Sequence, residues 1–176
     1  MNFTNRVAVA ADIPAIAALM ARAIGALQRG FLTPAQVEAS RAVMGLDTQL
    51  IADGTYLLVE VEGRLAGCGG WSRRATLYGG DHSTALRDAA LLDPARDAAR
   101  IRAMYTDPDF TRRGVGRLVL SVCEAAARDA RFARAEMMAT LAGEPLYRAC
   151  GYLPIERIET SGDVPVPMIR MGKDLG

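Results

Sequence analysis

The chain has 176 residues, 51% of them hydrophobic, which suits one domain with a substantial core. Its 21 basic and 20 acidic side chains nearly cancel, so the global charge does not favour binding to nucleic acid or to an anionic membrane. Three widely spaced cysteines, Cys68, Cys123 and Cys150, fit neither a disulfide framework nor a zinc cluster. We therefore expect one domain over residues 1–176, in the cytoplasm, without a metal.

The N-terminal segment predicts a strand over residues 6–9 and then a helix capped by Asp12. Its core-facing stripe recurs at three- and four-residue steps: Ile13, Ile16, Met20, Ile24 and Leu27. Asp12, Pro14 and Arg22 interrupt the apolar run, so we expect neither a signal peptide nor a membrane span here.

Thr33, Pro34 and Gln36 form a capping-box pattern, which predicts a second helix from Pro34 to about Met44. Two strands over residues 56–61 and 64–72 follow, joined in an antiparallel hairpin at Glu62-Gly63. Glycines at 67, 69 and 70 indicate a bulge or the close approach of another group. Residues 73–97 lack periodicity, and we interpret them as an insertion beside the site.

The second half of the chain alternates strands and helices. A strand over residues 99–106 places Ile101, Ala103 and Tyr105 on one face and stops at Asp107-Pro108. The strongest helical pattern follows, over residues 114–131. We then expect a strand over 135–141, a short helix over 145–149, and a terminal hairpin of residues 152–160 and 166–173. The predicted fold class is mixed α/β.

The turn between the 99–106 strand and the long helix is a candidate anion site. A helix N-terminus presents free amide groups and the positive end of the helix dipole. Gly114 and Gly116 let the main chain approach a phosphate, while Arg112, Arg113 and Arg117 add charged donors. The alternative interpretation is that these arginines form an ordinary solvated surface. The pattern lacks the Gly-Lys-Ser/Thr of a P-loop and the three-glycine spacing of a Rossmann fold.

A second motif favours the anion site over the solvated surface. It is the run Leu146-Tyr147-Arg148-Ala149-Cys150-Gly151-Tyr152, which follows about 30 residues after the run from Pro108 to Arg117. Together the two runs resemble the GNAT superfamily of N-acyltransferases. The resemblance implies a mostly antiparallel twisted sheet of about six or seven strands, with the fourth and fifth splayed apart and about four flanking helices. Thr111 and Thr140 depart from the family pattern, which has Arg or Gln and often Asn at these places.

The resemblance also implies roles for individual residues. The turn from Arg112 through Val115 to Arg117 would bind the pyrophosphate of acetyl-CoA, and backbone groups near Tyr105 and Thr106 would line its pantetheine arm. Tyr147 would lie near the sulfur and protonate the departing thiolate. The alternative for Tyr147 is an ordinary tyrosine that closes the core. Four residues are candidates for the acceptor pocket: Trp71, Arg73, Tyr78 and His82.

The implied reaction is direct attack of an amine on the thioester, with both substrates bound together and the N–H of Thr106 stabilising the developing oxyanion. The sequence singles out no general base; the candidates are a water chain and the side chains of Asp107, Glu136, Glu144 and His82. Cys68 has no activating neighbour in the sequence, and we interpret it as an inert buried thiol.

We expect an N-acetyltransferase for a small-molecule amine, in a chain whose sequence is compatible with a homodimer. Two alternatives stay open: a non-catalytic acyl-CoA-binding regulatory module, and a peptide or protein N-acetyltransferase. The long 73–97 segment favours a covered pocket over the open groove that a peptide requires.

Overall fold

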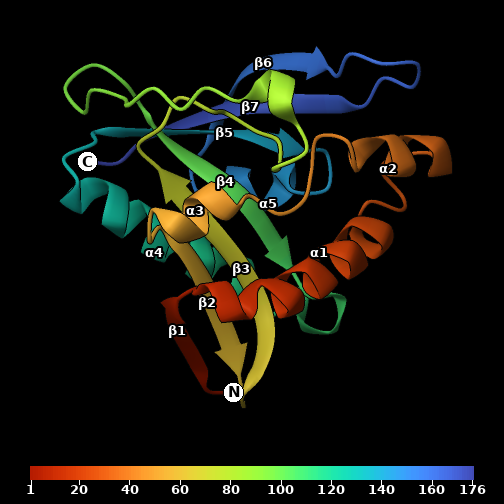
Figure 1. Cartoon of the computed structure of the whole chain (residues 1–176), viewed down its shortest axis with the longest axis horizontal. Helices are drawn as coiled ribbons and strands as arrows, with labels where there is room; N and C mark the ends of the chain where they lie inside the picture. Colours follow the sequence, from red (N-terminus) through yellow and green to blue (C-terminus); the bar gives the residue numbers. More distant parts are fainter.

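The computed structural model describes all 176 residues. Seven strands form one sheet in the order β1-β2-β3-β4-β5-β7-β6, in which β4 and β5 are the single parallel pair (Figure 1). The strands are β1 (Phe3–Val7), β2 (Tyr56–Val61), β3 (Arg64–Ser72), β4 (Ala99–Thr106), β5 (Arg134–Thr140), β6 (Leu153–Glu159) and β7 (Pro167–Asp174). The helices are α1 (Ile13–Leu27), α2 (Pro34–Ser40), α3 (Thr48–Ala52), α4 (Val115–Asp129) and α5 (Glu144–Ala149). The predicted mixed α/β fold is confirmed, with five α-helices where about four were expected.

The splaying of the fourth and fifth strands is also confirmed. β4 and β5 pair only at their first residues, Ala99 with Ala135 and Arg100 with Glu136. Beyond these pairs β4 runs away from β5, which continues beside β7 along the top of Figure 1. The facing edges of both strands therefore lack strand partners for most of their length, and a gap opens between them.

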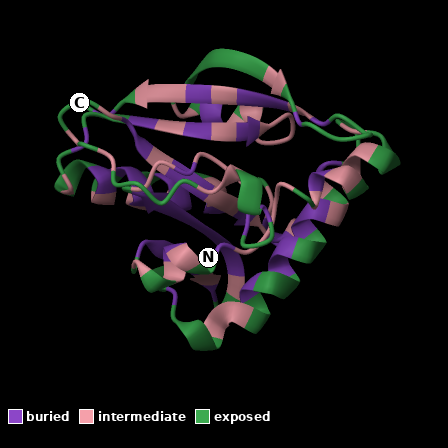
Figure 2. Ribbon diagram, turned by 45° about the horizontal axis from the view of Figure 1, so that its top comes forward, coloured by how far each residue is buried: buried purple, intermediate pink, exposed green.

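Two hydrophobic clusters fill opposite faces of the sheet. On β2, Leu57, Val59 and Val61 belong to the cluster beneath α4, while Tyr56 and Leu58 belong to the cluster beneath α1. This is the two-residue alternation of a strand buried on both sides. Figure 2 shows the corresponding buried stripe of α1 on its sheet-facing side. The β2–β4 part of the sheet is thus covered on both faces, and the β4–β5 gap opens at its edge.

A bulge in the β3–β4 pair corrects the expectation that Ile101, Ala103 and Tyr105 share a face. Ala103 has a positive φ of 50° and the pairing register shifts between Cys68 and Gly70. One residue is thereby added to the alternation, so Ile101 packs in the α4 cluster and Tyr105 in the α1 cluster. The three glycines of β3 correctly indicated a bulge here. A Cβ at Gly69 would lie 2.4 Å from the sulfur of Met104.

The starts of α1 and α2 lie where they were predicted, but the end of α2 and the cap of α1 need correction. Thr33 and Gln36 form the expected capping box of α2, which ends at Ser40 and not near Met44. Asp12 precedes α1, but its carboxylate does not cap that helix. It accepts the N–H of Val9 at 2.8 Å and pairs with Arg6, and these contacts lower its pKa to about 2. The sequence did not predict α3.

Residues 73–97 form an irregular excursion, as expected, that docks on the loop after α2. The Oγ of Ser83 donates to the carbonyl of Ala42, and the N–H of Asp81 donates to the carbonyl of Leu46. His82 Nε2 donates to the carbonyl of Arg41 at 2.7 Å. These bonds fasten two loops together over one side of the β4–β5 gap.

Residues Ala10–Leu27 are long and apolar enough to span a membrane by length and composition alone, a test that core helices of soluble proteins also pass. Here the apolar face of this segment packs on the sheet. Its buried side chains are those of Ile16, Leu19, Met20, Ala23 and Ile24.

Candidate active site

The larger cavity is a cleft of about 680 Å³ at the open ends of β4 and β5. Its walls come from the C-terminal half of α1, the end of β4, the turn before α4, and the start of α5. Eight of the nine residues predicted for the cofactor and for catalysis line it: Tyr105, Thr106, Arg112, Gly114, Val115, Gly116, Arg117 and Tyr147. Segments far apart in the sequence thus meet in one cleft.

The turn before α4 has the backbone of an anion site. Arg112 and Gly114 have positive φ values of 59° and 88°, and the first helical hydrogen bond runs from the N–H of Leu118 to the carbonyl of Gly114. The amide groups of Val115, Gly116 and Arg117 consequently have no acceptor in the protein. They stand at the positive end of the α4 dipole, as a bound phosphate requires.

Gly116 packs closely against the wall of the cleft. A Cβ there would lie 2.8 Å from Leu146 Cδ2 and 3.5 Å from Thr106 Oγ1, and both residues line the cleft. The residues present fit a phosphate-bearing ligand, since the turn offers free amide groups and a side chain at position 116 would crowd the cleft beside Leu146.

The predicted arginines of the turn divide into two groups. Arg112 and Arg117 line the cleft, whereas Arg113 lies outside its lining with its guanidinium 5.8 Å from the ring centre of Phe110. Thr111, the first departure from the family pattern, also lines the cleft, and its Oγ1 donates to the carbonyl of Pro108 at 3.2 Å. Arg112 and Arg117 are therefore the two cationic side chains of the turn that can contact a polyanion in the cleft.

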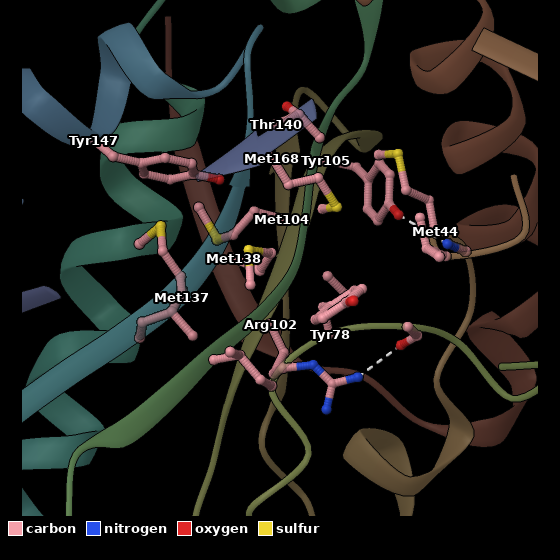
Figure 3. Close-up of a pocket in the computed structure, with 16 residues that line it drawn as sticks. Met44, Tyr78, Arg102, Met104, Tyr105, Met137, Met138, Thr140, Tyr147 and Met168 are labelled. Carbon is pink, nitrogen blue, oxygen red and sulfur yellow. Dashed lines mark hydrogen bonds between the residues drawn. The ribbon is translucent and has the colours of Figure 1, made fainter. Parts of the chain in front are cut away.

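Tyr147 stands where the cleft meets a second, smaller cavity, and it lines both. Its ring is buried and packs edge-on against Tyr152, with 6.2 Å between the ring centres. Burial raises the pKa of its phenol well above the ordinary value. The hydroxyl points toward the gap between the strands (Figure 3). A neutral, protonated phenol is therefore held at the junction.

The end of β4 supplies a backbone donor to the same gap. The N–H of Asp107 donates to the carbonyl of Ala66 on β3, and Thr106 is paired with Gly67. Because hydrogen bonds alternate along an antiparallel ladder, the N–H of Thr106 is directed away from β3, toward the edge that faces the gap. Tyr105 lies next to it, and its hydroxyl accepts the N–H of Gly45 at 2.9 Å.

The smaller cavity, of about 80 Å³, lies between the splayed strands under the two docked loops. Five of the eight methionines of the chain line it: Met44, Met104, Met137, Met138 and Met168 (Figure 3). Met44, Met104, Tyr105, Thr140 and Tyr147 line both cavities, so the two are adjacent. This wall could not be predicted from the sequence, because four separate segments contribute its methionines.

Arg102 is the one charged side chain in the wall of the smaller cavity, and it is fully engaged. Its Nη2 donates to Asp47 Oδ2 at 2.8 Å and to the carbonyl of Gly79 at 2.7 Å, and only 3% of the side chain is exposed. Asp47 also pairs with Arg87 at 2.8 Å. This buried network holds the 73–97 excursion against β4.

Of the four residues predicted for the acceptor pocket, only Tyr78 lines either of these two cavities. Trp71 lies in the α4 cluster with its ring edge-on to Phe132, and Arg73 stacks on Trp71 at 5.3 Å. His82 is exposed and bonded to the loop after α2. The β3 strand turns Trp71 toward the core face, which the position of the residue in the sequence did not reveal.

None of the candidate general bases lines either cavity. Asp107 pairs with Arg22 at 3.1 Å, and Glu136 pairs with Arg100 at 3.1 Å and with Arg170. Glu144 pairs with Arg148 at 2.9 Å and with Arg157 at 3.1 Å. Cys68 is fully buried in the α1 cluster, and burial raises the pKa of its thiol to about 12. It is not an activated nucleophile.

The wall that α1 and the turn after it contribute to the cleft was not predicted. It consists of Ala23, Ile24, Leu27, Gln28 and Phe31. The helical periodicity marked Ile24 and Leu27 as core residues, and both also face the cleft because the splay of β5 leaves the end of α1 without a complete sheet beneath it.

Residues 23–152 match the sequence model of the Acetyltransferase (GNAT) family. No curated protein sequence matches the chain. Among solved structures, a GCN5-related N-acetyltransferase from Rhodopseudomonas palustris is similar, with 18% identity, coverage of 99% of this chain and 96% of the other, and a TM-score of 0.72.

Two further structures share the fold. The putative acetyltransferase yncA from Salmonella typhimurium with its cofactor acetyl-CoA has 19% identity, 99% and 94% coverage, and a TM-score of 0.64. The ribosomal-protein-S18-alanine N-acetyltransferase from Escherichia coli has 16% identity, 99% and 94% coverage, and a TM-score of 0.60. At these identities the likeness establishes the fold.

Proposed function

The chain belongs to the GNAT acetyltransferase family, and from this premise we propose that it transfers the acetyl group of acetyl-CoA to the primary amine of a small molecule. The observation that carries the proposal is the junction of the two cavities at Tyr147. One cavity has the donors for a phosphate-bearing cosubstrate and the other an apolar wall for an acceptor. Both substrates can therefore be bound together, and transfer can be direct.

The turn before α4 is suited to hold the pyrophosphate of acetyl-CoA. The free amide groups of residues 115–117 and the guanidinium groups of Arg112 and Arg117 supply the donors, and Gly116 keeps the passage beside Leu146 open. Acetyl-CoA supplies the activated thioester. Thr111 contributes a short hydroxyl where an arginine or glutamine would be longer, so more of the phosphate binding falls on Arg112 and Arg117.

Two groups of this chain are placed to assist the transfer. The N–H of Thr106, directed into the gap, can donate to the carbonyl oxygen on which negative charge develops. Tyr147, protonated and located at the junction, can donate its proton to the departing sulfur. These two donors act on opposite sides of the bond that breaks.

The enclosure of the acceptor side supports a small molecule over a peptide. The loop after α2 and the 73–97 excursion are bonded to each other and both line the smaller cavity. An extended peptide needs an open groove. Here the two docked loops cover the side of the smaller cavity where such a groove would have to lie. Retention of the acceptor in a covered cavity also excludes water from the thioester.

A matched pair of tyrosine variants tests the proposal. Tyr147→Phe should lower kcat by about 100-fold or more and leave acetyl-CoA affinity unchanged, because a general acid contributes roughly that factor. Tyr152→Phe is the control, since Tyr152 is buried beside Tyr147 but lines neither cavity. Thiol release is measured across an amine panel, and acetyl-CoA binding is measured by thermal shift. Binding without turnover on any amine would identify a regulatory acyl-CoA-binding module.

We also propose that the protein acts in the cytoplasm. Its three cysteines are free thiols, as a reducing compartment maintains them. Fractionation of cells that produce the protein at its natural level tests this, and recovery in a membrane or secreted fraction would contradict it.

A further inference from the structure

The chemistry of the acceptor cavity specifies the kind of amine, if the proposed function holds. Its wall is built largely from methionine and aliphatic side chains. Its tyrosines contribute uncharged hydroxyl groups. Methionine is flexible and polarizable and makes favourable contacts with aromatic rings. The wall therefore suits an apolar, aromatic body more than a charged or heavily hydroxylated one.

No aspartate or glutamate lines either cavity. The buried carboxylate of Asp47 is not free to meet a ligand, because it pairs with both Arg102 and Arg87. The charged side chains that do line the cavities, Arg102, Arg112 and Arg117, are all cationic. An ammonium ion in the smaller cavity would meet no counter-ion, because Arg102, the one charged residue of its wall, is cationic and already paired with Asp47.

Burial of an unpaired ammonium is among the most costly events in a protein interior. An alkylamine is mostly an ammonium at neutral pH, so this site would have to select its rare neutral form and would also need a base to generate it. A weakly basic amine is already neutral. The absence of a counter-ion and the absence of a general base in the cavities are then explained by one property of the acceptor.

We propose that the acceptor is an aromatic amine, uncharged at neutral pH, bound with its ring among the methionines of the smaller cavity. In the transfer, the amine nitrogen forms a bond to the acetyl carbonyl carbon and the carbon–sulfur bond breaks. The sulfur takes the proton of Tyr147, and the proton lost by the nitrogen returns to Tyr147 through water. The products are an aryl amide and the free thiol, and no other reactant is consumed.

Two isomeric amines, 4-methylaniline and benzylamine, test the proposal. They have the same molecular formula, but benzylamine is much the more basic of the two. At about pH 7 the kcat/KM for 4-methylaniline should exceed that for benzylamine by at least about tenfold, and it should be flat between about pH 6 and pH 8. Turnover of benzylamine with equal or higher kcat/KM at neutral pH would overturn the inference and leave the proposed function intact. Binding of acetyl-CoA with no turnover of any amine would overturn both.

A carboxylate introduced into the cavity tests whether the lack of a counter-ion is what disfavours an ammonium ion. Met44 lines both cavities and lies in a partly exposed loop, so Met44→Glu adds a carboxylate at the junction, and Met44→Gln is its uncharged control of the same shape. Met44→Glu should raise the benzylamine to 4-methylaniline ratio of kcat/KM at least about tenfold relative to Met44→Gln. An equal ratio in the two variants, with acetyl-CoA binding retained, would overturn the proposal.

Discussion

The phenol of Tyr147 is the residue on which the proposed chemistry depends most directly. Burial disfavours the charged phenolate, so its pKa is raised above the ordinary value of about 10 and the protonated form persists to higher pH. With both substrates saturating, kcat should show no loss from Tyr147 deprotonation between about pH 7 and pH 10. The pH profiles of the wild type and Tyr147→Phe check this. A wild-type decline centred below about pH 9, absent from the variant, would contradict it.

At the residue scale, motif and spacing found Tyr147 because its family pattern fixes it relative to Gly151. Proximity along the chain was a poor guide to the acceptor side. Trp71 and Tyr78 are seven positions apart, yet one packs in the core and the other lines the cavity. The direction of each side chain depends on the strand face and the loop path, which single residues do not encode.

At the element scale, the β4–turn–α4 unit makes a specific prediction. Gly116→Ala should weaken acetyl-CoA binding at least about tenfold, equivalent to about 1.4 kcal/mol, because its methyl group pushes Leu146 into the cleft. Isothermal titration measures the affinity. The helix itself should still form, since alanine is a good helix former.

Gly25→Ala is the matched control for this change. Gly25 lies inside α1, and a Cβ there meets only Arg41 Nη2 at an ordinary 3.6 Å. This variant should bind acetyl-CoA normally and gain about 0.5–1 kcal/mol of unfolding free energy from the helix preference. Equal losses of affinity in both variants would show that the turn is not the cause.

Elements with strong local patterns were predicted well. The bounds of β2, β3 and β4 agree with the structure, and both hairpin residues, Glu62 and Gly63, have the positive φ values of a tight turn. The glycines of β3 indicated the bulge, but they did not indicate that Tyr105 would face the α1 cluster. The face on which a side chain lies after a bulge depends on which of the two strands carries the extra residue. α3 has five residues, too few for a periodic signal.

At the scale of the whole molecule, the buried ion network of Asp47 joins three distant segments. Asp47→Ala should lower the free energy of unfolding by about 3–5 kcal/mol, because it leaves Arg102 buried without its partner. Urea denaturation measures the loss. The variant should also bind acceptor amines more weakly, since Arg102 fastens the excursion that covers the cavity.

Asp53→Ala is a control of the same chemistry at a more exposed pair. Asp53 bonds Arg74 at 2.7 Å, but 27% of the arginine side chain is exposed. Its loss should cost only about 0–1 kcal/mol. A similar cost for both variants would mean that burial of the Asp47 network adds nothing to stability.

The sequence by itself determined the order of the seven strands and of four of the five helices, the candidate anion turn and the family, because these depend on short-range patterns: helical periodicity, caps, glycines and two motifs. Only the tertiary structure decided the cavity that we propose for the acceptor. The cavity exists because β4 and β5 part after two residue pairs, and its wall is assembled from side chains as distant as Met44 and Met168. Such a wall has no local signal, since contact between its members follows from the packing of the sheet as a whole.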